Sequence, residues 1–107
     1  MRFEYLNGPQ DGRIIETDRQ QFEMGRNEKN LIAMPYGPFV SDCHGKVRVQ
    51  GDIVVFADTG NEGEGSTNGT TLRRQGRPPD YFKRDERELQ PGDILVLGDN
   101  IWIKYLG

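Results

Sequence analysis

Hydrophobic and polar residues alternate along most of the chain, in short runs that turn residues interrupt. The pattern begins at Phe3 and Tyr5, whose side chains fall on one face of an extended segment. A period of two residues is typical of β-strands with one buried face. We therefore predict strands over residues 2–6, 13–16, 21–24, 30–33, 46–50, 53–56, 70–72, 94–97 and 101–106.

Turn residues separate these segments and leave no room for a helix. Pro35, Gly37 and Pro38 lie close together, and a proline inside a helix removes a hydrogen bond and clashes with the preceding turn. Residues 73–88 form the one long segment without a period, with six basic and four acidic residues. We predict an irregular loop there, either solvated or serving as a rim for a partner. Nine or ten short strands and no helix predict an all-β fold, a two-sheet β-sandwich.

Composition and charge narrow the picture to a small globular domain. With 107 residues and a hydrophobic fraction of 34%, the chain can bury one core, so we expect a single domain over residues 1–107. The formal net charge of −3 disfavours a nucleic-acid partner, because binding to a phosphate backbone calls for a clear basic excess. A monomer is favoured, without the sequence determining the oligomeric state.

Membrane insertion and disulfide formation are also disfavoured. No apolar run approaches the ~20 residues that a membrane helix needs. Residues 1–5 do not lead into the apolar segment of a signal peptide. Cys43 is the single cysteine, so no internal disulfide can form and a reducing compartment is indicated. We therefore expect a cytoplasmic protein without a membrane partner.

The sequence contains few residues that could form a catalytic or metal site. His44 is the single histidine, and its neighbour Cys43 points to the opposite face of an extended backbone. The two therefore do not easily share a metal or act as nucleophile and base. The Gly-rich stretch 63–70 lacks the lysine of a nucleotide-binding P-loop. We expect no catalytic residues, no metal and no cofactor.

Polar loops instead indicate a site for an anion or an extended backbone. Asn68-Gly69 predicts a tight turn, and residues 66–70 carry hydroxyl and amide groups on short side chains. Arg26 follows Gly25, which we expect to let the backbone turn and project the guanidinium, a group suited to phosphate. Ser41 begins a third polar loop. Loops of this kind gather at one end of a sandwich.

Four motifs in order resemble the forkhead-associated (FHA) domain family. They are Gly25-Arg26, Ser41-x-x-His44, Ser66-Thr67-Asn68-Gly69-Thr70 and Leu89-x-Pro91-Gly92-Asp93-x-Leu95-x-Leu97-Gly98. The resemblance extends from about residue 3 to residue 106. It implies a non-enzymatic sandwich of about eleven short strands that recognises phosphothreonine in a partner protein, downstream of a Ser/Thr kinase, with binding loops clustered at one end.

The resemblance implies four phosphopeptide-binding residues. Arg26 would contact the phosphate, and Ser41 would hydrogen-bond a phosphate oxygen. Thr67 would support the phosphothreonine site, and Asn68 would bond the peptide backbone beside it. Arg26 and Ser41 would thus recognise the phosphate, and Thr67 and Asn68 would recognise the peptide that carries it.

The resemblance also implies four structural residues. Gly25 and His44 would support the site, with His44 bracing the loop that carries Ser41. Gly69 and Thr70 would shape the turn. These residues would act through the fold rather than by touching the ligand.

Asp42 departs from the family pattern, because a carboxylate beside Ser41 would repel a phosphate. We expect Asp42 to point outward or to pair with Lys29 or Lys46, which lie at the periphery of the site. The loop 57–65 adds further acidic residues. The alternative hypothesis is therefore an FHA-like domain that binds a protein surface or itself without phosphate, because Asp42 has weakened the phosphate pocket.

Overall fold

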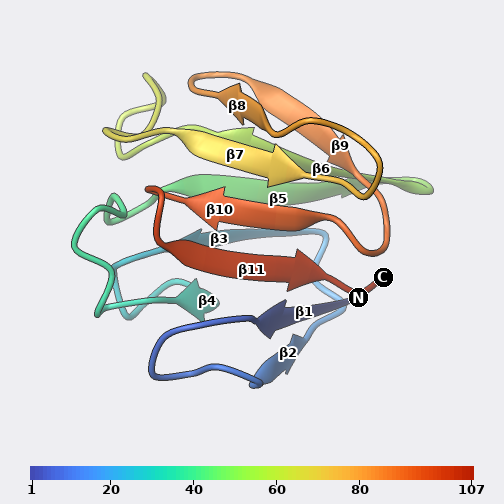
Figure 1. The fold of residues 1–107 in the computed structure, drawn as a ribbon, viewed down its shortest axis with the longest axis horizontal. Coiled ribbons are helices and arrows are strands. Elements are labelled where there is room, and N and C mark those ends of the chain that lie inside the picture. The colour runs from blue at the N-terminus through green and yellow to red at the C-terminus, as the bar shows by residue number, and fades with distance from the viewer.

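The computed structural model describes residues 1–107, which form eleven β-strands and no helix (Figure 1). Six strands make one sheet in the order β2-β1-β11-β10-β7-β8, and five make the other in the order β4-β3-β5-β6-β9. The predicted all-β sandwich is therefore confirmed. The strands are β1 Arg2–Tyr5, β2 Ile14–Glu16, β3 Gln21–Gly25, β4 Ile32–Ala33, β5 Gly45–Gln50, β6 Ile53–Asp58, β7 Thr70–Arg73, β8 Asp80–Phe82, β9 Glu86–Leu89, β10 Ile94–Leu97 and β11 Ile101–Tyr105.

Alternating side chains from both sheets build the hydrophobic core. In β11, Ile101, Ile103 and Tyr105 are buried while the residues between them are half-exposed. Antiparallel pairing places Ile103 beside Leu95 of β10, so inward-facing positions line up across the sheet. Phe56 and Val47 face them from the other sheet and belong to the same cluster of 18 buried residues. The alternation read from the sequence therefore marks the two inner faces.

The prediction for residues 73–88 is wrong, because this segment contains two strands. β8 pairs with β7 in one sheet, and β9 pairs with β6 in the other, so the segment links the two sheets. Each strand contributes one core residue, Phe82 and Leu89. Their remaining positions are mostly charged, and Arg87 bridges Asp80 and Asp85. One apolar residue per strand is too few to show a period of two.

Most other strands differ from the predicted bounds by one or two residues at an end, and three of these differences bear on the site. β4 covers residues 32–33 rather than 30–33, and it pairs with β3 in parallel. β6 continues beyond residue 56 to Asp58, although a buried aspartate does not belong to an apolar strand pattern. β5 begins at Gly45 rather than at residue 46.

The connections of the sandwich divide between its two ends (Figure 1). The β3–β4, β4–β5, β6–β7 and β10–β11 connections gather at one end, on the left of the figure. Both termini and the β5–β6, β7–β8 and β9–β10 connections lie at the other end, where the N–H of Arg2 donates to the carbonyl of Gly107 (3.2 Å). No helix in the structure has the length and apolar character needed to cross a membrane.

Candidate functional site

Three loops meet at the end of the sandwich that faces away from the termini (Figure 1). The backbone N–H of Arg26 donates to the carbonyl of Ser41 at 3.0 Å, which joins the loop after β3 to the loop before β5. The backbone N–H of Thr67 donates to the hydroxyl oxygen of Ser41 at 3.1 Å, which brings in the β6–β7 loop. The fold thus gathers Arg26, Ser41 and Thr67, which are far apart in the sequence.

Arg26 uses one of its guanidinium nitrogens to bind a neighbouring residue of the site. Its Nε donates to Oδ1 of Asp42 at 3.2 Å, and the two side chains remain 43% and 56% exposed. The other guanidinium nitrogens make no hydrogen bond within the chain, so their N–H groups are available to an external anion.

The expected partners of Asp42 were wrong. Lys46 lies 3.7 Å from Glu23 instead, and Lys29 is held through its backbone N–H, which donates to the side chain of Asn27 (2.9 Å). Asp42 faces Arg26 because backbone bonds from Arg26 and Asn27 to the loop before β5 place the two side chains next to each other.

His44 connects two loops from a fully buried position. Its Nδ1 accepts the backbone N–H of Ser41 at 3.2 Å, so the ring proton must lie on Nε2. Nε2 donates to the carbonyl of Gly69 at 2.8 Å and lies 3.1 Å from Oγ1 of Thr70. Burial lowers the pKa of His44, while the Gly69 carbonyl and Asp58 act in the opposite direction. The neutral imidazole therefore links the Ser41 loop to the β6–β7 turn.

Gly25 leaves room for the Ser41 loop, and the expectation that it turns the chain was wrong. Gly25 is the last residue of β3, and its φ lies outside the left-handed region. A Cβ there would collide with the carbonyl oxygens of Ser41 and Asp42 and with the backbone nitrogen of His44. The glycine is required because two backbones approach each other without space for a side chain.

Asp58 is a residue of this site that the sequence analysis missed. It is 2% exposed, and its carboxylate accepts the backbone N–H (2.6 Å) and hydroxyl (2.6 Å) of Ser66 and the hydroxyl of Thr70 (2.7 Å). The Ser66 hydroxyl in turn accepts the N–H of Gly69 (2.9 Å). The sequence contained one signal, since Asp58 ends an apolar run immediately before a Gly-rich loop.

Asn68 lies at the tip of the turn between two exposed aromatic residues. Its Nδ2 donates to the backbone carbonyl of Phe39 at 2.9 Å, and its backbone carbonyl accepts the hydroxyl of Tyr81 at 3.3 Å. Phe39 is 55% exposed and Tyr81 is 59% exposed. Gly69 has a φ of 80°, and the Tyr81 ring occupies the place of a side chain there. The Oδ1 of Asn68 makes no hydrogen bond within the chain and can accept one from a ligand.

The second half of the 73–88 segment belongs to this site, whereas the first half does not. Nζ of Lys83 donates to the carbonyl of Thr67 at 3.2 Å, so β8 and the turn after it border the β6–β7 loop. Residues 73–79 lie in the β7–β8 connection at the opposite end (Figure 1). No group of three His, Cys, Asp or Glu side chains is placed to hold a metal.

The sequence matches the FHA domain family model over residues 22–98. No curated protein sequence matches the chain. The FHA domain of FhaA, solved in complex with the intracellular domain of Rv3910, is 27% identical, with a TM-score of 0.71 and 96% of each chain covered.

Two further solved structures are similar in fold. One comes from a study of phosphothreonine-dependent FHA domain interactions and is 27% identical, with a TM-score of 0.70, covering 96% of this chain and 91% of that chain. The FHA domain of a hypothetical protein from Arabidopsis thaliana is 22% identical, with a TM-score of 0.79, covering 99% of this chain and 85% of that chain. The latter likeness is one of fold alone.

Proposed function

Because this chain belongs to the FHA domain family, we propose that it is a phosphothreonine-dependent protein-binding module of Ser/Thr kinase signalling. Residues 1–107 would form one such domain. The similar structure from work on phosphothreonine-dependent FHA domain interactions supports this proposal. FHA domains are interaction modules, so the activity proposed is binding and not catalysis.

The hydroxyl of Ser41 is the observation that carries the proposal. Its oxygen accepts the backbone N–H of Thr67 at 3.1 Å, which leaves its own hydrogen free to donate to a phosphate oxygen. The unpaired N–H groups of Arg26 extend from the adjoining loop. A phosphate monoester carries about −1.5 to −2 charges at neutral pH, and each charge-assisted bond contributes about 1.5–3 kcal/mol. Arg26 and Ser41 are thus the phosphate-binding pair.

Thr67 and Asn68 hold the peptide on the other side of the phosphate. Thr67 faces Ser41 through its backbone, and the free Oδ1 of Asn68 accepts a backbone N–H of an extended segment. The exposed rings of Phe39 and Tyr81 flank Asn68 and offer apolar surface. We therefore expect a preference for apolar residues beside the phosphothreonine, because burying them against these rings removes apolar area from water.

A second candidate function rests on the ion pair between Arg26 and Asp42. The carboxylate lies 3.2 Å from Nε of Arg26, where it competes with an external phosphate for the same positive charge. If this competition prevails, the loops bind a protein surface or a second copy of the chain without phosphate.

Calorimetric titration with three matched peptides separates the two candidates. The peptides carry phosphothreonine, phosphoserine or unmodified threonine in the same apolar context. Phosphothreonine dependence predicts micromolar binding of the first peptide and binding at least tenfold weaker for the others. Equal binding of all three peptides would support the phosphate-independent function instead.

Replacing Arg26 with alanine tests the assigned residue. Losing two charge-assisted bonds of about 1.5–3 kcal/mol each predicts a loss of affinity of about 100-fold or more. The thermal midpoint should hardly change, because an exposed ion pair contributes about 0–1 kcal/mol. Arg19→Ala is the matched control, since Arg19 is exposed and forms no ion pair. Unchanged affinity in a folded Arg26→Ala variant would refute the assignment.

A further inference from the structure

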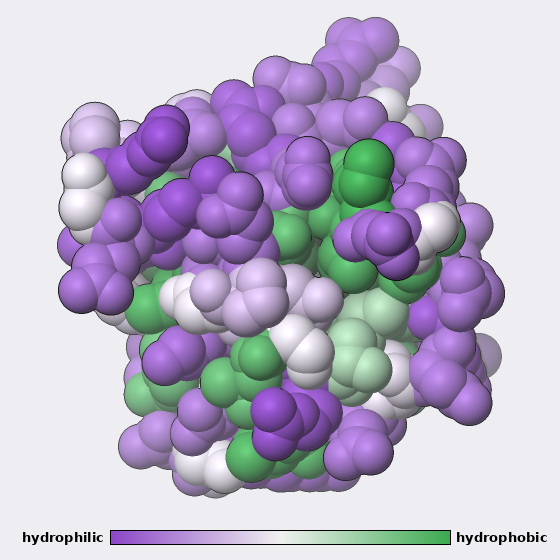
Figure 2. Space-filling model, turned by 90° about the vertical axis from the view of Figure 1, so that its right-hand side faces the viewer, coloured by the Kyte–Doolittle hydropathy of each residue, from purple (hydrophilic) through white to green (hydrophobic).

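A second group of cationic side chains surrounds a cavity at the end of the sandwich that carries the termini. The cavity has a volume of about 420 Å³. Figure 2 views this end, where hydrophilic surface predominates. No carboxylate lines the cavity, and its charged lining consists of Arg73, Arg74, Arg77 and Lys104. We call this the basic pocket.

Three of the four cations form no ion pair. Arg74 is neutralised by Asp93, which accepts from Nε at 2.8 Å and from Nη2 at 2.7 Å. Arg73, Arg77 and Lys104 form no ion pair. The basic pocket therefore holds three positive charges that no ion pair neutralises, although Glu4 of β1 lies opposite Lys104 in the strand register.

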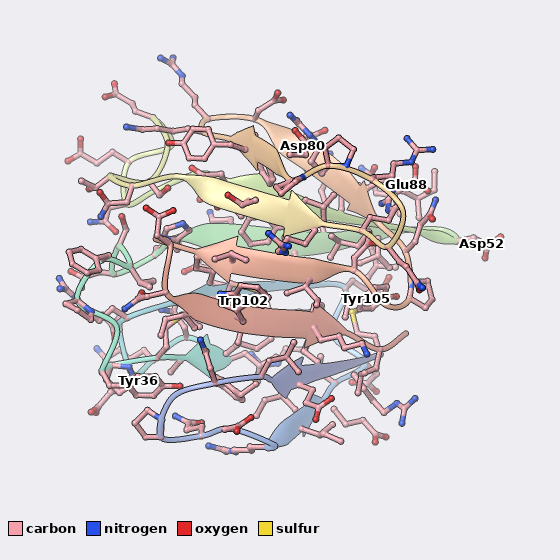
Figure 3. The ribbon with its side chains drawn as sticks, in the orientation of Figure 1. Tyr36, Asp52, Asp80, Glu88, Trp102 and Tyr105 are labelled. Atoms are coloured by element: carbon pink, nitrogen blue, oxygen red, sulfur yellow. The ribbon has the colours of Figure 1, made fainter.

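The strand register places two of these cations on opposite sides of one residue. Ile94 of β10 is paired with Arg73 of β7 and with Lys104 of β11, so the three residues form a row across the sheet. The guanidinium of Arg73 lies 5.2 Å from the ring centre of Trp102, on the outer face of β11 (Figure 3). Stacking on this ring limits the positions that Arg73 can take. The positive charges thus project from a regular sheet and not only from a loop.

The Arg74–Asp93 pair holds the remaining wall of the basic pocket. Asp93 is 2% exposed and accepts the backbone N–H of Gln90 at 2.8 Å, which ties the β9–β10 turn together. Because Arg74 spans from the β7–β8 connection to this carboxylate and to the carbonyl of Glu88 (3.2 Å), the two connections are fixed to each other. Arg77 follows in the same turn, where its N–H donates to the carbonyl of Arg74 (3.0 Å). Buried support of this kind positions the pocket before a ligand arrives.

We propose that the basic pocket binds a phosphate group carried by a protein segment, at a site separate from Arg26. Three positive charges that form no ion pair, around one cavity, match the charge of about −1.5 to −2 on a phosphate monoester better than the single charge of a carboxylate. Arginine also offers a planar pair of donors to two phosphate oxygens.

Nucleic acid fits the surroundings of the basic pocket less well. Duplex DNA presents one charge about every 1.7 Å and is bound by cations that continue along its path. Here Asp80 and Glu88 lie beside the pocket at this end of β8 and β9 (Figure 3). These carboxylates would face the neighbouring phosphates of a polymer, whereas a single phosphate group avoids them.

Two-dimensional amide NMR on the ¹⁵N-labelled chain tests the proposal. The probes are inorganic phosphate and a Gly/Ser octapeptide with one phosphoserine, its glutamate and unmodified counterparts, and a short DNA duplex. The titrations use the wild-type chain and the Arg26→Ala variant, so that the result does not depend on the site at Arg26. We expect saturable shifts at residues 73–77, 92–94 and 104 in both proteins, with the phosphopeptide binding at least fivefold more tightly than the glutamate peptide.

Single substitutions identify the cations that bind. Arg77→Ala and Lys104→Ala should each weaken phosphopeptide binding at least fivefold. Arg19→Ala, which removes an unpaired arginine from the β2–β3 connection at the same end, should leave it unchanged. Shifts shared by all exposed cations, equal binding of the glutamate peptide, tighter binding of the duplex, or indifference to both substitutions would each overturn the proposal.

Discussion

At the residue scale, Asp42 controls how much of the positive charge of Arg26 is offered to a ligand. The carboxylate is exposed and lies 3.2 Å from Nε, so it both orients the guanidinium and reduces its attraction for another anion. The exposed pair adds little to folding stability, which leaves its effect on binding as the measurable one.

We predict that Asp42→Asn tightens phosphothreonine-peptide binding. Removing a repulsion of about 1 kcal/mol corresponds to an affinity gain of about fivefold. Calorimetric titration measures the change. Glu23→Gln is the matched control, because it removes the same charge from another exposed pair, at Lys46. Weaker binding by Asp42→Asn would mean that orientation of Arg26 outweighs repulsion.

His44 makes the stability of the domain depend on pH. Its pKa is lowered by burial in the folded chain, whereas the unfolded chain titrates near the usual value of about 6.5. Between these two values the unfolded chain binds more protons, so the free energy of unfolding rises with pH. The contribution of His44 is present in full above about pH 6.5 and is lost as the pH falls toward the lowered pKa.

We therefore predict that the domain is less stable to urea at about pH 5.5 than at about pH 7.5. Protonation of Nδ1 would also remove the acceptor for the Ser41 N–H, so phosphopeptide binding should weaken over the same range. His44 is the single histidine, and its ring signals in NMR report its pKa directly. A folded-state pKa at or above about 6.5 would contradict the prediction.

At the element scale, the end of β3 determines the position of the Ser41 loop. Gly25 ends the strand with no space for a side chain, because the backbones of Ser41, Asp42 and His44 occupy it. The end of β3 and the Ser41 loop therefore pack backbone against backbone. This contact places Arg26 beside Ser41.

We predict that Gly25→Ala destabilises the domain by about 2–3 kcal/mol, as overpacking of a dense region does. The amide NMR signals of Ser41 and Asp42 should shift, and phosphopeptide binding should weaken. Gly51→Ala, in an open turn with a φ of 61°, provides the control. Strain at that φ should reduce stability without changing the signals of Ser41 or the affinity.

Strand patterns show what could be predicted at this scale. The predictions for 46–50 and 94–97 match the observed strands closely, because inward-facing apolar residues recur at every second position, Val47 and Val49 in β5 and Leu95 and Leu97 in β10. β8 and β9 were missed since each has one core residue among charged neighbours. A strand of this kind is defined by pairing with β7 or β6, and pairing partners are not visible in local sequence.

At the scale of the whole molecule, the proposed phosphothreonine site and the chain termini lie at opposite ends of a body about 31 Å long (Figure 1). The β10–β11 turn belongs to the site end, since the N–H of Gly98 donates to the carbonyl of Gly69 (3.2 Å). The β5–β6 turn, with Asp52 at its tip, projects from the terminal end (Figure 3).

We predict that the same flexible Gly/Ser insertion has different effects at the two ends. Placed after Asp52, it should leave phosphopeptide affinity within about twofold, because exposed turn tips tolerate insertions. Placed after Asp99, it should weaken affinity by about tenfold or more, because it distorts the β10–β11 turn, whose Gly98 supports the turn that carries Asn68. Titration of both variants with one phosphothreonine peptide measures the difference. Equal effects at the two turns would place the binding surface elsewhere.

The sequence alone determined the strand-rich architecture, the FHA resemblance and the set of loop residues around Arg26 and Ser41. These features depend on local periodicity and on motif spacing, which the linear chain carries. Only the tertiary structure decided that Asp42 pairs with Arg26, that Asp58 holds Ser66 and Thr70, and that residues 73–88 divide between two ends. Each of these depends on which distant residues the sandwich brings within bonding distance, and that distance is set by strand pairing and packing.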